Sequence, residues 1–176
     1  MSWEDETGST VCPIAKSLSA VGDRWTLLIM RELSMGVCRF DDMQAQLGAS
    51  SYTLSTRLKR LELDGIIGRR KYSVKGERYE YFATEKGRAL DPILLLLRAW
   101  GMKYCEHTEG AEPAVNLIHK PTGQVVDENW QIPTDEWPFS LDTLEGTLGK
   151  AFATERENKR NAFRKLPKPK AKTKAE

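Results

Sequence analysis

The sequence has few residues of the kinds that build disulfide frameworks and metal sites. Its three cysteines, Cys12, Cys38 and Cys105, are odd in number and widely spaced, and none belongs to a Cys-x-x-Cys pair. This pattern excludes a disulfide scaffold and a zinc ribbon. The two histidines, His107 and His119, have no second metal-ligand motif, so we expect neither a metal ion nor a cofactor.

Long apolar runs and catalytic signatures are also missing. No apolar stretch approaches the roughly 20 residues that a membrane span requires. The acidic N-terminus "MSWEDETGST" lacks the apolar centre of a secretory signal. These features predict a cytoplasmic protein with no membrane partner. The chain has no HExxH, P-loop, GxSxG or GxGxxG motif, and we therefore expect no enzymatic activity.

Charge is segregated along the chain, although the formal net charge is only +2. Residues 57–79 carry eight Lys and Arg against three Asp and Glu, residues 106–145 carry one Lys against nine acidic residues, and residues 150–176 carry ten basic residues against three Glu. Such segregation says more about partners than the total does. Four parts are expected: a disordered lead over 1–11, a domain over 12–106, an acidic extension with a hairpin over 107–149, and a partly disordered basic tail over 150–176.

The first half contains a succession of short amphipathic helices. Pro13 suits the first turn of a helix that ends near Val21. Asp23 is a candidate N-cap for a second helix within "RWTLLIMRELSMG". The second helix is expected to direct three apolar residues inward: Leu28, Ile29 and Leu33.

Two further helices have the spacing of a helix-turn-helix. A third helix begins near Phe40, Gly48 can adopt positive φ in the turn "LGAS", and Ser50 is the expected N-cap of "SSYTLSTRLKRLELDG". Two short helices joined by a three- or four-residue turn that contains Gly form the helix-turn-helix pattern. A stripe of leucines in the second of them recurs at helical period and should pack inward: Leu54, Leu58 and Leu61.

The hydrophobic period changes after Gly65. The stretches "IIGRRKYS" and "RYEYFA" are rich in β-branched and aromatic residues and flank "VKGE", which predicts a hairpin with a basic tip. Thr84 is the expected cap of one long helix that continues to Tyr104. Between Ile93 and Leu97 this helix is apolar on all sides, which indicates burial by a partner subunit; the alternative is that the chain's own core covers it.

The C-terminal third has weaker patterns. "AVNLIHKPTGQVVD" predicts a second hairpin that turns at "PTG", and "LDTLEGTLGKAFATERENKRNAFRKL" is expected to be helical. The expected fold class is α+β and mainly α. It consists of a winged helix-turn-helix domain, a long C-terminal dimerisation helix and a C-terminal extension.

Four motifs in this order resemble the HxlR-type transcriptional regulators, which are winged-helix relatives of the MarR group. They are "CPIAKSLSAVGDRWTLLIMREL", "RFDDMQAQLG", "LSTRLKRLELDGII" and "RYEYFATEKGRAL". The resemblance covers the chain from Cys12 to Tyr104 and implies a homodimeric repressor that binds an inverted repeat in double-stranded DNA. Two features depart from the family pattern. The wing tip around Lys75 lacks prolines, and Thr122 stands where many members have a cysteine.

The resemblance places the helix that follows Ser50 in the major groove, where the N-terminal half of a recognition helix meets base edges. The residues expected to face bases are Ser51, Tyr52, Thr53 and Thr56, flanked by Ser55 and Arg57. Arg57 either pairs with guanine or clamps a phosphate, and its position on the helical wheel favours the phosphate. The residues expected to meet the DNA backbone are Lys59, Arg60, Arg69, Arg70, Lys71, Lys75 and Arg78, with Arg24 and Arg39 as weaker candidates. For each, the alternative is a solvated side chain.

The dimer is expected to form through the first and last helices of the domain, with Leu94, Leu97, Trp100 and Tyr104 between the subunits. Cys12 matches a cysteine that some family members use to sense oxidants or electrophiles, and a helix N-terminus favours negative charge. The alternatives are a packed thiol at the dimer interface and a regulator controlled by a small molecule. A different function also stays open, that of a winged-helix module that binds proteins without specific DNA recognition.

Overall fold

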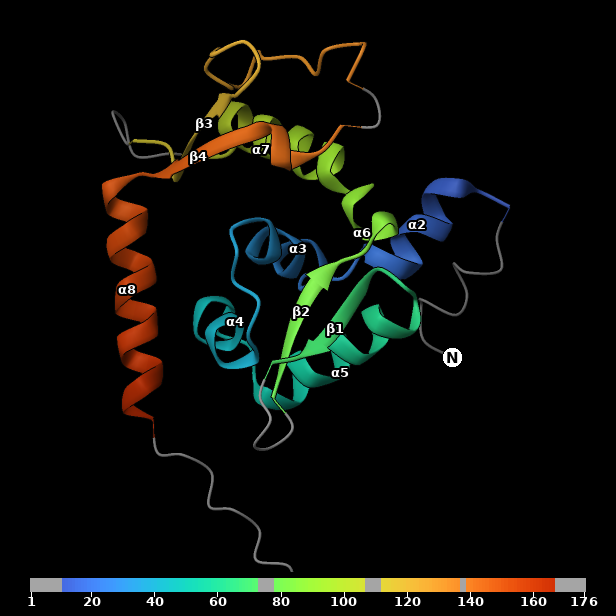
Figure 1. The fold of residues 1–176 in the computed structure, drawn as a ribbon, viewed down its shortest axis with the longest axis vertical. Coiled ribbons are helices and arrows are strands. Elements are labelled where there is room, and N and C mark those ends of the chain that lie inside the picture. The colour runs from blue at the N-terminus through green and yellow to red at the C-terminus, as the bar shows by residue number, and fades with distance from the viewer. Residues whose placement is uncertain (1–10, 73–77, 107–111, 137–138, 167–176) are drawn as a thin grey trace, which may run out of the picture.

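The computed structural model describes residues 11–72, 78–106, 112–136 and 139–166. In chain order (Figure 1) the elements are α2 Pro13–Val21, α3 Thr26–Ser34, α4 Phe40–Leu47, α5 Ser51–Leu63, β1 Ile67–Lys71, β2 Tyr79–Ala83, α6 Glu85–Arg88, α7 Asp91–Tyr104, β3 Val115–His119, the 3-10 turn η1 Leu141–Thr143, β4 Leu144–Leu148 and α8 Lys150–Lys165. The fold is α+β and mainly helical, as the sequence predicts. In the described ranges no helix is long and apolar enough to cross a membrane.

Helices α4 and α5 form the predicted helix-turn-helix. Gly48 ends α4 with a φ of 66°, and Ser50 Oγ accepts the backbone N–H of Thr53 at 3.0 Å to cap α5. Both predictions are confirmed, because the turn needs a residue without a Cβ and the helix needs a side-chain acceptor at its start. The leucine stripe is at most 1% exposed and packs with three residues of α3 and α4: Ile29, Met30 and Met43.

Strands β1 and β2 form the predicted hairpin, here called the wing. They pair antiparallel, with Ile67 opposite Ala83 and Lys71 opposite Tyr79. Thr84 anchors the base of the wing, because its Oγ1 donates toward the carbonyl of Ile66 at 3.0 Å. The tip of the wing, including Lys75, lies outside the described residues.

Helix α3 begins slightly later than predicted. Its first residue is Thr26, so Asp23 is not the N-cap. Asp23 Oδ1 instead accepts the backbone N–H groups of Trp25 at 2.8 Å and Thr26 at 3.1 Å, and so closes the turn that leads into the helix. Ile29 is fully buried as expected, whereas Leu28 and Leu33 are only half-buried.

The prediction of one helix over residues 85–104 is wrong, because the chain breaks there into α6 and α7. Thr84 caps α6 as expected, accepting the N–H of Gly87 at 3.2 Å. Pro92 lies in the first turn of α7. A proline has no N–H for the carbonyl four residues earlier, and its ring collides with that carbonyl. At the first turn of a helix the missing donor costs nothing, so Pro92 starts a new helix instead of continuing the old one.

The C-terminal extension differs from its prediction. Strand β3 pairs along its length with β4, with Val115 opposite Leu148 and His119 opposite Leu144. The expected hairpin at "PTG" is reduced to a single bridge between Ile118 and Val125. Residues 144–148, expected to be helical, form a strand, and only α8 keeps the predicted helix.

A second core lies under the β3–β4 ribbon. It consists of Leu95, Val126, Phe139 and Leu144. Figure 1 shows the ribbon and α7 as one layer, with α8 descending from β4 toward α4. The side chain of Gln46 in α4 donates to the carbonyl of Arg156 in α8 at 3.1 Å. The two cores are therefore joined twice, through α7 and through α8.

Candidate nucleic-acid interface

The outward face of α5 presents hydroxyls, a tyrosine and cations. Tyr52 is 82% exposed, and α5 has no carboxylate before Glu62. The exposed members of the predicted set are Ser50, Ser51, Tyr52, Thr56, Lys59 and Arg60, and the half-buried members are Thr53, Ser55 and Arg57. Because the leucine stripe fixes the opposite face in the core, the rotation of α5 about its own axis is set. The exposed face is available to a groove.

Among the side chains predicted to face or flank the bases, Thr53 and Arg57 already have partners within the protein. Thr53 Oγ1 lies 2.8 Å from Ser50 Oγ, so its hydroxyl belongs to the helix cap. Arg57 Nη1 lies 3.2 Å from Asp23 Oδ2, and the Arg57 side chain is only 22% exposed. Arg57 would have to leave Asp23 to read a guanine.

Glu80 of the wing is a residue that the sequence did not single out. Arg39, at the start of α4, donates two hydrogen bonds to Glu80 Oε1, at 3.0 and 3.1 Å. Arg70 Nη2 lies 3.3 Å from the other carboxylate oxygen. These contacts, that of Arg39 first, lower the pKa of Glu80, while Glu80 raises the pKa of Arg39. Glu80 therefore ties the wing to the start of α4, and two predicted phosphate ligands share one carboxylate.

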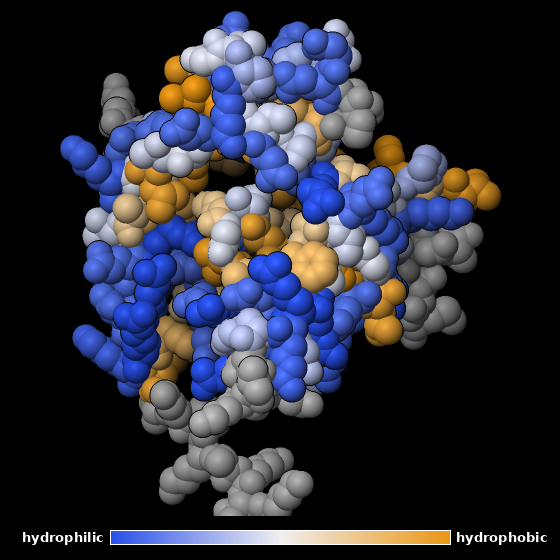
Figure 2. Space-filling view, in the orientation of Figure 1, coloured by the Kyte–Doolittle hydropathy of each residue, from blue (hydrophilic) through white to orange (hydrophobic). Residues whose placement is uncertain are grey.

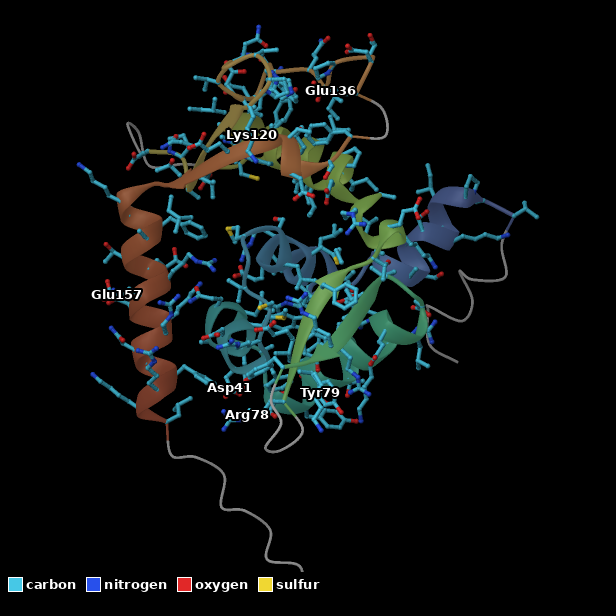
Figure 3. All side chains as sticks on the ribbon, viewed as in Figure 1. Asp41, Arg78, Tyr79, Lys120, Glu136 and Glu157 are labelled. Atoms are coloured by element: carbon cyan, nitrogen blue, oxygen red, sulfur yellow. The ribbon has the colours of Figure 1, made fainter. Side chains whose placement is uncertain are left out.

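The remaining cations of the interface lie along the wing and the end of α5. Arg60 pairs with Asp64 at 2.9 Å, and Arg69 pairs with Glu62 at 2.9 Å while lying over the ring of Tyr79. Lys71 and Arg78 are exposed. Figure 3 places Arg78 and Tyr79 at the lower edge of the molecule, and Figure 2 shows that this lower part is mostly hydrophilic. The wing and α5 thus form one polar surface rich in arginine and lysine.

The predicted dimer residues are mostly uncovered in the single chain. Leu97, Trp100 and Tyr104 are exposed on α7, with the rings of Trp100 and Tyr104 5.7 Å apart. Leu94 is half-buried because it packs against the chain's own first core. Helix α2 exposes two more apolar side chains, Ile14 and Leu18.

The cysteine and histidine candidates have different surroundings. Cys12 is exposed at the N-cap of α2. His119 is fully buried, with Nδ1 2.8 Å from Thr122 Oγ1 and Nε2 within 3.0 Å of the Glu136 carboxylate. Its ring also lies 5.2 Å from that of Trp130, which makes it part of the packing of the extension. In the part of the chain that the structure describes, no three His, Cys, Asp or Glu residues are grouped to hold a metal ion.

Comparisons with known proteins agree with this geometry. The HTH-type transcriptional regulator Rv3095 of Mycobacterium tuberculosis is 41% identical over 114 residues, which cover 65% of this chain and 71% of that protein. The solved structure of PA1607, a candidate transcription factor, superposes with a TM-score of 0.62 at 32% identity and covers 74% of this chain and 89% of the other. The oxidized form of the redox regulator HypR superposes with a TM-score of 0.50 at 28% identity and covers 55% of this chain and all of the other.

The family assignment follows from the helix-turn-helix and its wing together with these matches. The model of the family described as HxlR-like helix-turn-helix matches residues 20–109, which run from the end of α2 past the end of α7. That span contains every element of the candidate interface. The chain belongs to the HxlR-like helix-turn-helix family and is a transcriptional regulator of the helix-turn-helix type.

Proposed function

We propose that the protein is a repressor that binds an inverted-repeat operator in double-stranded DNA as a homodimer. The observation that carries this proposal is the exposed face of α5. It offers hydroxyls, a tyrosine and cations, with no carboxylate before Glu62, on a helix whose orientation is fixed by a buried leucine stripe. Base edges in the major groove are read by such donors and acceptors, and a carboxylate would be repelled by the phosphates.

Within α5, Ser51, Tyr52 and Thr56 are the proposed base contacts. All three are exposed, and they belong to the N-terminal half of the helix, which enters the groove in this docking mode. Arg57, held by Asp23, is assigned to a phosphate at the edge of the groove. The wing supplies further phosphate contacts through Lys71 and Arg78, which are exposed.

The dimer is proposed to form through α2 and the outer face of α7, defined by Ile93, Leu96, Leu97, Trp100 and Tyr104. All five are exposed apolar or aromatic side chains on one helix. Contiguous apolar patches of this kind mark sites of association. A symmetric dimer would place two copies of α5 about one DNA turn apart, roughly 10–10.5 base pairs.

The test uses a pool of random duplexes from which the purified protein selects its preferred sequence. We expect an inverted repeat, bound by two protein chains. The double variant Tyr52→Ala/Thr56→Ala should lose the preference for this repeat over random duplex, by about 1–3 kcal/mol for each lost base contact. Thr154→Ala, which removes an exposed hydroxyl from α8, is the matched control and should bind as the wild type does.

The competing function is a winged-helix module that binds proteins and needs no specific DNA. It predicts that the double variant behaves like the wild type and that no sequence is enriched from the pool. Either result would remove α5 from the role of recognition helix.

A further inference from the structure

A large cavity separates the two cores. Its volume is about 1280 Å³, and it lies between α3, α7, the β3–β4 ribbon and α8. Figure 2 shows a recess with apolar surface in this region, to the right of α8 and below the ribbon. The walls include apolar residues from all four elements, among them Leu28, Leu95, Met102, Leu117, Leu144 and Phe152.

The lining of this cavity is that of a ligand site. Small-molecule sites have volumes of about 300–1,000 Å³ and mostly apolar walls with a few polar groups. This cavity reaches beyond that range, and neither α5 nor the wing contributes to its lining. It is therefore separate from the candidate DNA interface.

The cavity also uses a different face of α7 from the proposed dimer. Leu94, Leu95, Arg98 and Met102 line it, and these positions follow one another along one side of the helix. Among the lining residues of α7, only Leu97 also belongs to the outer face. A partner subunit on the outer face would leave the cavity open.

The polar groups of the cavity are mainly arginines. Arg31 and Arg156 share the single carboxylate of Glu32, with the shortest N–O distance 2.6 Å for each. Arg98 donates to the carbonyls of Val115 and Val126, both at 2.9 Å. Arg160 lines the cavity from the exposed side of α8.

The carboxylates do not balance these cations. Burial lowers the pKa of Arg98, and the charges of Asp127 and Glu128 oppose this only through space. Glu112 and Glu155 also line the cavity, but Glu112 accepts the first N–H of α8 and Glu155 pairs with Lys159 at 2.6 Å. Over the described ranges, no carboxylate forms an ion pair with Arg98 or Arg160.

We propose that this cavity binds a small amphipathic anion, with an apolar chain or ring system between the leucine walls and one carboxylate or sulfonate group toward Arg160. Charge-assisted hydrogen bonds to guanidinium groups hold such a head group well. Binding at this site does not depend on the proposed DNA binding. The ligand would touch α3 and α8 at once and would favour the arrangement in which they lie together.

The test is calorimetric titration of the full chain with decanoate and, in parallel, with decanol. Decanoate should bind at one saturable site, at least about tenfold more tightly than decanol, because only decanoate gains a charge-assisted bond. Ala151→Trp fills the cavity from α8 and should abolish decanoate binding. Ala162→Trp places the same ring on an exposed part of α8 outside the cavity and should leave it unchanged.

A second pair of variants tests the charge and keeps the test valid if Ala151→Trp does not fold. Arg160→Gln should weaken decanoate about tenfold and leave decanol unaffected, whereas Lys165→Gln, an exposed cation farther along α8, should change neither. Absence of saturable decanoate binding, equal affinity for both probes, or equal binding by a folded Ala151→Trp would each overturn the proposal.

Discussion

Replacing Arg156 with leucine should strongly destabilise the protein. Arg156 Nη1 and Nη2 lie 3.1 and 2.6 Å from the two oxygens of Glu32, whose side chain is 0% exposed, while that of Arg156 is 9% exposed. Removing one partner of a buried ion pair costs about 3–5 kcal/mol, because the other charge stays in the interior without compensation. Arg31 remains 2.6 Å from Glu32 Oε1 and keeps part of that compensation. We therefore expect a loss of about 2–3 kcal/mol, below the full range.

Urea denaturation of the full chain measures this loss. Lys159→Leu is the matched control, because it breaks the exposed pair between Lys159 and Glu155, one helical turn apart on the same helix, and should cost about 0.3–0.5 kcal/mol. The double variant Glu32→Gln/Arg156→Leu removes both charges and should be more stable than Arg156→Leu alone.

Two results would refute the role proposed for Arg156. If Arg156→Leu were no more destabilising than Lys159→Leu, Arg156 would not hold α8 against α3. The same conclusion would follow if the double variant lost as much as the sum of its two single variants, because residues in direct contact do not act independently.

Four further results are expected. Lys71→Gln should weaken binding to all duplexes alike and should reduce the slope of log affinity against log salt concentration by about one unit. A selective loss of operator binding would mean that the wing reads bases. Trp100→Glu should sediment as a monomer and should bind the operator less tightly than the wild type. A wild type that itself sediments as a monomer would contradict the proposed dimer. Diamide should alter operator affinity in the wild type and not in Cys12→Ser, which should bind normally when reduced; an equal response in both would exclude Cys12 as the sensor. Because Arg39 lowers the pKa of Glu80, the stability that this pair contributes is complete above the ordinary carboxyl pKa of 4.5 and is lost as pH falls through the lower pKa of the folded state. Glu80→Gln should therefore be less stable than the wild type at neutral pH, and the difference should vanish in acid once Glu80 is protonated.

The winged helix-turn-helix could be predicted from sequence because its signals are local. Leu54, Leu58 and Leu61 repeat at the period of one helix, and Gly48 and Ser50 mark the turn and the cap within the same short stretch. Nothing distant in the chain is needed to interpret them. The break at Pro92 is also encoded locally, but the apolar run that follows it favours the prediction of one continuous helix.

The C-terminal extension could not be predicted in the same way. "LEGTL" becomes a strand only because β3, far away in sequence, offers its edge. Arg156 belongs to a stretch with many cations, and no local feature distinguishes the one that is buried. Likewise, Glu80 was one carboxylate in a basic wing, and its two arginine partners became visible only with the fold.

The break between α6 and α7 changes how motion could pass through this molecule. Lys86 of α6 donates to the carbonyl of Asp64 at the end of α5 at 2.6 Å, whereas Asp91 of α7 accepts the N–H of Leu141, which packs against the second core, at 2.9 Å. Four residues, 87–90, separate these two anchors, whereas a continuous helix would hold both anchors on one rigid rod. Helix α8 makes a second tie to the first core's helices, because Arg156 contacts Glu32 of α3 and accepts a hydrogen bond from Gln46 of α4. In the proposed dimer, a change of angle at this break would alter the distance between α7 and the proposed recognition helix α5.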